Sequence, residues 1–156
     1  MILIQLTPNE LELLRTLLAQ YEELVQVDSD DPALERLFPV AYRDDPDAAA
    51  EFRQYTRSGL VDSKTAKAGA VAAALLGGSG DDGGSIALSD DEAERWLPVL
   101  TDLRLIVAER LGIRADDDPV PADSLGEVYD WLGQLQGYLI DAVEALADAR
   151  DGKAAE

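Results

Sequence analysis

The sequence predicts an all-α fold, a helical bundle of about five helices with a minor two-stranded β-ribbon at residues about 2–6 and 85–88. Three observations indicate this fold. Apolar side chains recur every three or four residues along the long segments, which is the spacing of one helix face. Ser or Thr followed three residues later by Glu marks several helix starts, a pattern called the capping box. The chain has 156 residues, of which 47% are hydrophobic, enough for the core of one domain.

The first helix is predicted directly after a short strand at residues 2–6. Thr7 suits the N-cap, Pro8 suits the first helical position, and Glu10 completes a capping box. The helix is expected to end near Asp28. Its buried face is formed by apolar residues at helical spacing, namely Leu11, Leu14, Leu18, Tyr21 and Val25.

The middle of the chain is predicted to hold a short helix from Pro32 to Leu37 and a longer helical segment from Asp47 to Leu76. Ser58-Gly59 is expected to break or kink the longer segment. Residues 77–85 are rich in Gly and predict a flexible loop. Beyond this loop, residues 86–92 repeat the pattern of the first strand and capped helix. We expect the two short strands to pair, because each needs a partner for its backbone groups.

Two more helices are predicted in the last third of the chain. One runs from about Asp90 to Leu111, with Pro98 expected to bend it or to leave its first part irregular. Ser124 with Glu127 predicts a capping box for the other. The last helix has an apolar seam along its length. This seam can be covered either by the other helices of the same chain or by a second copy of the chain. We expect one domain at residues 1–148 and a frayed tail at 149–156. The seam consists of Leu125, Val128, Leu132, Leu135, Leu139, Ala142 and Leu146.

The composition excludes several kinds of chemistry. The chain contains no Cys and no His, so it offers no thiolate, no disulfide and no imidazole base. The commonest zinc ligands are therefore also absent. No acidic cluster follows the spacing of an EF-hand calcium loop. We expect a protein without cofactor or metal that is not an enzyme.

The charge limits the partners. Thirty-two acidic against 13 basic residues give a net charge of −19, which repels nucleic acid and anionic membranes. No run approaches the roughly 20 apolar residues of a membrane span, and no signal peptide begins the chain, so a cytoplasmic location is expected. Three interpretations of the acids remain open: a solvated surface, attraction to a basic partner, and mimicry of a nucleic-acid backbone.

Two groups of residues are candidates for a site. Asp102, Arg104, Tyr129 and Asp130 lie on the last two helices, where Arg104 is expected to meet Asp130. They predict either a polar pocket for a small molecule or a structural network, because a charge on a core-facing helix is costly unless it is paired.

The second group, Phe38, Tyr42 and Arg43, lies in a connection between helices. Its side chains are expected to be exposed and to contact a partner. The alternative is that they anchor the connection into the core.

Three blocks of sequence resemble an uncharacterised family of actinobacterial proteins: residues 37–53, residues 103–112 and residues 128–136. The resemblance covers nearly the whole chain. Members of that family are often encoded near a ClpS-type protease adaptor, which implies a role around regulated proteolysis. The family brings no established activity, cofactor or catalytic residues, so none is carried over to this chain.

These observations favour a non-enzymatic cytosolic regulatory or adaptor protein that binds another protein. The alternatives are a small-molecule binder or enzyme that uses the Arg/Asp pocket, and an acidic nucleic-acid mimic.

Overall fold

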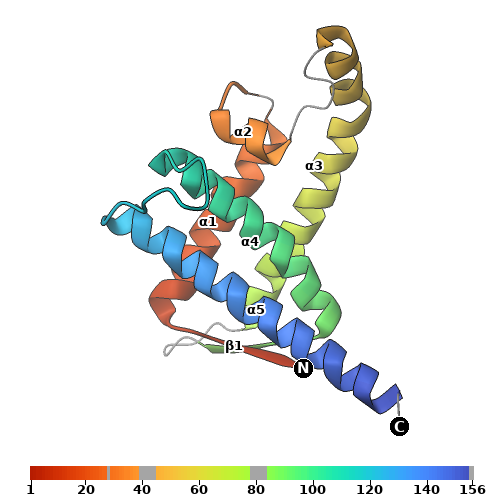
Figure 1. Ribbon diagram of the computed structural model, residues 1–156, viewed down its shortest axis with the longest axis vertical. Helices are drawn as coiled ribbons and strands as arrows, with labels where there is room; N and C mark the ends of the chain where they lie inside the picture. The colour runs from red at the N-terminus through yellow and green to blue at the C-terminus, as the bar shows by residue number, and fades with distance from the viewer. Residues whose placement is uncertain (28, 39–44, 78–83, 155–156) are drawn as a thin grey trace.

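The computed structural model describes residues 1–27, 29–38, 45–77 and 84–154 of the chain. Over these residues the fold is mostly α-helical with one small antiparallel ribbon, as the sequence predicts (Figure 1). The elements in chain order are β1 (Ile2–Leu6), α1 (Pro8–Gln26), α2 (Pro32–Leu37), α3 (Pro46–Gly77), β2 (Gly84–Leu88), α4 (Asp90–Leu111) and α5 (Ser124–Ala154).

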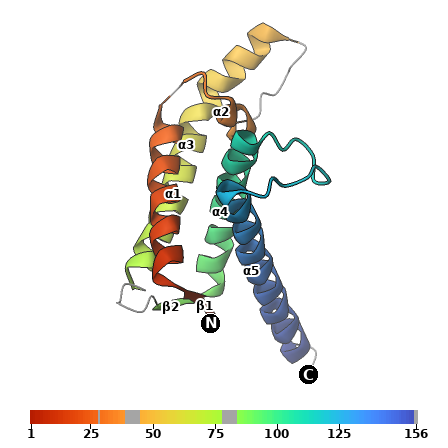
Figure 2. The ribbon, with the colours of Figure 1, turned by 90° about the vertical axis from the view of Figure 1, so that its left-hand side faces the viewer.

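The ribbon joins two segments that are far apart in the sequence. β1 and β2 pair antiparallel, with Ile4 opposite Ile86 and Ile2 opposite Leu88. Residues at alternate positions of β1 are buried, because successive side chains of a strand point to opposite faces. The ribbon closes one end of the bundle and starts both α1 and α4 from the same place (Figure 2). The predicted pairing is confirmed.

Capping boxes begin α1 and α4 as predicted. The Thr7 hydroxyl accepts the Glu10 N–H at 3.1 Å, and the Glu10 carboxylate accepts the Thr7 N–H at 2.9 Å. Ser89 and Glu92 make the same reciprocal pair.

The third capping box, expected from Ser124 and Glu127, is wrong. Asp123 caps α5 instead, because its carboxylate accepts the Gly126 N–H at 2.8 Å and its carbonyl accepts the Glu127 N–H at 3.0 Å. Ser124 is consequently the first residue of the helix rather than its cap.

The longest helix, α3, continues through Gly59 without a break. Figure 2 shows that the first part of α3 tilts away from the axis of the rest. The break or kink predicted from Ser58-Gly59 therefore corresponds to a bend within one helix. A helical Gly costs about 1 kcal/mol relative to Ala, an amount that the packing of α3 on α1 and α4 offsets. α4 likewise remains one helix although it contains Pro98. The predicted Gly-rich loop lies outside the described residues over 78–83.

The core lies between α1, α3 and α4, and α5 packs on the outside of α4 (Figure 2). Trp96 and Tyr21 are the largest fully buried side chains. The seam of α5 faces its own bundle in the middle of the helix, where Leu132, Leu135 and Leu139 are buried. The frayed tail expected from residue 149 is helical through Ala154 and is tied back by an ion pair of 2.9 Å between Arg150 and Asp90.

Replacement of two glycines of α5 by alanine is expected to have opposite effects on stability. A Cβ at Gly126 would lie 1.9 Å from the carbonyl oxygen of Pro121, whereas a Cβ at Gly137 would meet nothing within 4 Å. We expect Gly126→Ala to lower the free energy of unfolding by about 1–3 kcal/mol through overpacking. Gly137→Ala should raise it by about 0.5–1 kcal/mol through helix propensity. Urea denaturation of both variants checks this, and a shift of both midpoints in the same direction would contradict it.

Candidate functional site

A buried carboxylate connects three helices. Asp102 on α4 is only 7% exposed and is the one charged residue in the buried class over the described parts of the chain. Its Oδ2 accepts a hydrogen bond of 2.5 Å from the hydroxyl of Tyr21 on α1. The same oxygen accepts one of 2.7 Å from the ammonium of Lys64 on α3. The carboxylate is therefore paired and hydrogen-bonded, which a buried charge requires.

The surroundings of Tyr21 and Lys64 agree with a structural role for this network. Burial, reinforced by the hydrogen bond to Asp102, raises the pKa of Tyr21 well above its ordinary value of 10.0, so the phenol stays a proton donor. The Lys64 ammonium also lies 5.6 Å from the centre of the Phe38 ring. Through these contacts one carboxylate joins α1, α3 and α4.

Arg104 does not meet Asp130. Its guanidinium stacks on Tyr129, with the central carbon 4.3 Å from the ring centre, and no ion pair joins it to a carboxylate within the described residues. Gly133 makes room for it, since a Cβ there would lie 3.1 Å from the arginine Nη2. On α5 it is Tyr129, and not the next residue, that contacts Arg104. Asp130 is exposed.

The second candidate group is only partly described. Phe38, expected to be exposed, is 7% exposed, and its ring lies under the Arg57 guanidinium at 4.4 Å. It follows α2 as the C-cap residue, and the apolar ring completes the core beneath that short helix. Tyr42 and Arg43 lie outside the described residues.

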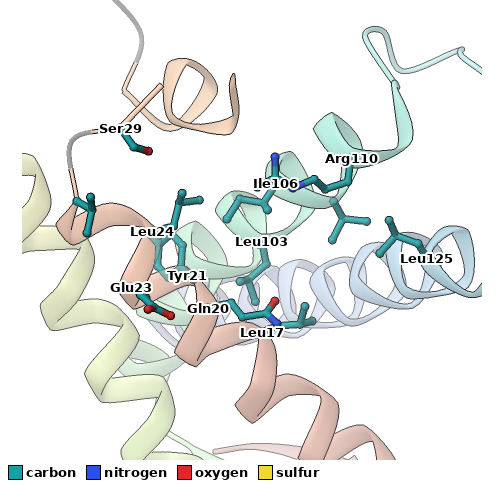
Figure 3. Close-up of a pocket in the computed structure, with 12 residues that line it drawn as sticks. Leu17, Gln20, Tyr21, Glu23, Leu24, Ser29, Leu103, Ile106, Arg110 and Leu125 are labelled. Carbon is teal, nitrogen blue, oxygen red and sulfur yellow. The ribbon is translucent and has the colours of Figure 1, made fainter. Parts of the chain in front are cut away.

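A groove between α1 and α4 is a feature that the sequence did not predict (Figure 3). Its volume is about 450 Å³, and Leu125 at the start of α5 closes one end. Val27 and Leu125 are 55% and 36% exposed, so apolar side chains reach the surface here. We call it the α1–α4 groove; it is lined by Leu17, Gln20, Tyr21, Glu23, Leu24, Val27, Ser29, Leu103, Ile106, Val107, Arg110 and Leu125.

The sequence did contain a signal for this groove. Leu17 and Leu24 widen the apolar face of α1 beyond its buried stripe, and Ile106 does the same on α4. A wide apolar face indicates either deeper burial or an open apolar surface, and periodicity does not distinguish the two. In the structure these side chains are only partly covered.

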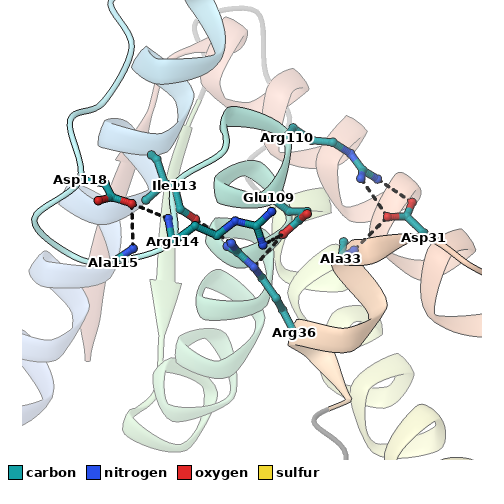
Figure 4. A network of polar contacts seen from close by, with 9 residues as sticks. All are labelled: Asp31, Ala33, Arg36, Glu109, Arg110, Ile113, Arg114, Ala115 and Asp118. Carbon is teal, nitrogen blue, oxygen red and sulfur yellow. Dashed lines mark hydrogen bonds and ion pairs between the residues drawn. The ribbon is translucent and has the colours of Figure 1, made fainter.

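The cation of the groove is already paired. Among the described lining residues the only basic one is Arg110, whose guanidinium donates two hydrogen bonds of 2.8 and 2.7 Å to the carboxylate of Asp31 (Figure 4). These bonds, with a further one from the Ala33 N–H, lower the pKa of Asp31 from 3.8 to about 2. Beside them Glu109 pairs with Arg36 at 2.9 Å, so α2 is tied to the end of α4.

Comparison with known proteins agrees with the family resemblance. Residues 1–143 match a family described as Domain of unknown function (DUF2017). The chain belongs to this family. It is 34% identical over 132 residues to the oxidative stress regulator AosR of Mycobacterium tuberculosis and of Mycobacterium bovis, an alignment that covers 70% of this chain and 57% of the relative. The chain thus spans little more than half the length of these curated relatives. No solved structure matches it.

The family and its mycobacterial relatives confirm the predicted actinobacterial resemblance in its general form. The neighbouring ClpS-type adaptor stays a prediction. Within the described residues, no group of three or more acidic side chains converges as a metal site. No described helix is long and apolar enough to cross a membrane.

The buried network predicts a large loss of stability on removal of Asp102. We expect Asp102→Ala to lower the free energy of unfolding by about 3 kcal/mol, because it leaves the Lys64 charge and the Tyr21 hydroxyl without their acceptor. The matched control, Asp130→Ala on the exposed face of α5, should change it by less than about 0.5 kcal/mol. Equal effects of the two substitutions in chemical denaturation would argue against this role of Asp102.

The Asp31–Arg110 pair predicts a measurable pKa change. Because the pKa of Asp31 is lowered in the folded state, its pairing stabilises the fold above pH 3.8, and this contribution is lost as the pH falls through about 2. Arg110→Ala should raise the pKa of Asp31 toward 3.8, as measured by NMR titration of its carboxyl carbon. Arg150→Ala, which removes a similar ion pair with Asp90, should leave the pKa of Asp31 unchanged. An unchanged pKa in Arg110→Ala would show that Arg110 does not cause the shift.

Proposed function

We propose that this protein is a non-enzymatic regulator that acts by binding another protein in the α1–α4 groove. The groove itself is the observation on which the proposal depends: it has a volume of about 450 Å³ and is lined mainly by apolar side chains, in a chain without His or Cys. Its exposed apolar residues are Val27 and Leu125, and exposed apolar side chains beside an apolar groove support an interaction surface. The name of the mycobacterial relatives, oxidative stress regulator, supports a regulatory rather than a catalytic role.

The composition limits the part that these residues can take in a response to oxidative stress. Thiol-based sensing requires a cysteine, and these 156 residues contain none, with a single methionine at position 1. If this chain serves the process for which its relatives are named, these 156 residues contribute binding rather than thiol chemistry.

The small-molecule alternative at Asp102 and Arg104 has less support. Both hydrogen bonds that Asp102 receives come from within the protein, and Arg104 is stacked on Tyr129 and flanked by Gly133. A role around regulated proteolysis is the finer form of the binding proposal, since an adaptor also acts by holding a segment of another protein.

Capture from native cytosol at moderate salt tests the proposal. The wild-type chain should retain a stoichiometric partner, identified by mass spectrometry, and Val27→Asp should lose it. Val27 lines the groove and is 55% exposed, so the change places a charge on the binding surface without removing a buried side chain. The matched control is Leu60→Asp on α3, a 42% exposed aliphatic residue outside the groove, which should retain the partner.

Melting temperatures of both variants equal to that of the wild-type chain would establish that neither substitution affects folding. Retention of the partner by Val27→Asp would place the binding surface elsewhere. A wild-type chain that retains no stoichiometric partner would contradict the proposed function itself.

A further inference from the structure

We infer that the occupant of the α1–α4 groove is an amphipathic helix of the partner protein, with lysines or arginines along the edges of its apolar stripe. This inference rests on the proposed function and adds the kind of segment that the groove accepts.

The walls of the groove have the repeat of a helix-binding surface. α1 contributes the partly exposed Leu17 and Leu24 with the buried Tyr21 between them, and α4 contributes the partly exposed Ile106 and the buried Leu103, about one apolar side chain for each helical turn. From Leu17 to Val27 the wall of α1 is about 15 Å long at a rise of 1.5 Å per residue. That length accommodates about three turns of a docked helix with apolar anchors at positions i, i+3 or i+4, and i+7.

The chemistry of the walls disfavours an extended segment. A strand or irregular peptide would bring unpaired backbone N–H and C=O groups against leucine, isoleucine and valine side chains, and each such group is costly when it is buried without a partner. Among the described lining residues, Gln20 and Ser29 are the only neutral polar ones whose side chains could replace these bonds, apart from the tyrosine hydroxyl that already donates to Asp102. A helix satisfies its own backbone and needs none of them.

The charge at the rim favours a basic helix. Glu23 lines the groove and is exposed, and the exposed acids Asp123 and Glu127 flank Leu125. Arg110 adds little positive charge because Asp31 pairs with it at two points. The net charge of −19 adds a long-range attraction for a cationic segment.

The same charges argue against two other occupants. A second copy would bring another net charge of −19 to the interface, where like charges repel. An anionic amphiphile such as a fatty acid needs a cation for its carboxylate. The described lining residues supply none that lacks a carboxylate partner.

Three stapled helical peptides of about 14 residues test the inference against the full chain by fluorescence anisotropy. The first has a leucine stripe flanked by lysines, the second has the same stripe flanked by glutamates, and the third has the lysines with serines in place of the leucines. We expect the first peptide to bind at one site, and the other two to bind at least about tenfold more weakly.

Substitutions in the protein locate the site. Leu125→Asp should weaken the leucine–lysine peptide at least about tenfold, and the matched Leu60→Asp should leave its affinity within about twofold. An aspartate at position 125 is compatible with folding, because the first turn of α5 favours negative charge. Glu23→Lys should also weaken this peptide, whereas Glu144→Lys, the same change on the exposed face of α5, should not.

Several results would overturn the inference. If the leucine–glutamate peptide bound as tightly as the leucine–lysine peptide, the basic flank would be contradicted. If the lysine–serine peptide did so, the interaction would depend on net charge alone and not on the apolar groove. Self-association of the chain that Leu125→Asp abolishes would assign the groove to a second copy. If the cytosolic partner depends on Val27 while the leucine–lysine peptide fails to bind, the proposed function stands and this inference falls. If the peptide binds in the groove while no partner is captured, the inference stands and the proposed function falls.

Discussion

The carboxylate of Asp102 is the contact on which the arrangement of the helices depends. Tyr21 and Lys64 reach the same oxygen from α1 and α3, so one buried group links the three helices that enclose the core. Apolar packing is non-directional and tolerates small shifts of one helix along another. The two hydrogen bonds do not tolerate such shifts, because a displaced partner would leave a buried charge unsatisfied. The ribbon of β1 and β2 adds a second constraint at the end where α1 and α4 begin.

The buried network and the surface groove share Tyr21. Its ring lines the α1–α4 groove while its hydroxyl is held by Asp102, so the contact that positions α1 against α4 also helps set the width of the groove. At the other end the Asp31–Arg110 and Arg36–Glu109 pairs hold α2 against α4, beside the same groove (Figure 4). Contacts within the chain therefore hold the groove in shape, and for the proposed binding function such a preformed surface would reduce the entropy lost on association.

Features that depend on near neighbours in the sequence were predictable. The capping boxes of Thr7 with Glu10 and Ser89 with Glu92 involve residues three apart, and the buried stripe of α1 follows from the helical repeat. Even these local signals can compete: Asp123 rather than Ser124 caps α5, because its carboxylate, one residue earlier, accepts the Gly126 N–H. The pairing of β1 with β2 was predictable because each short strand needed a partner and the two matched.

The sequence by itself determined the helical class, the ribbon, most helix starts and a chemistry without thiols or imidazoles. Only the tertiary structure decided which side chains meet. It placed Tyr129 rather than Asp130 on Arg104, because the orientation of α5 on α4 leaves Asp130 on the exposed side. It buried Phe38, because the C-cap position of α2 places this ring among the core side chains. It left Leu17, Leu24 and Ile106 partly open as a groove, because no element of the described chain packs over that face of α1 and α4. Helical periodicity records that a face is apolar, and whether that face is covered depends on how the helices are placed in space.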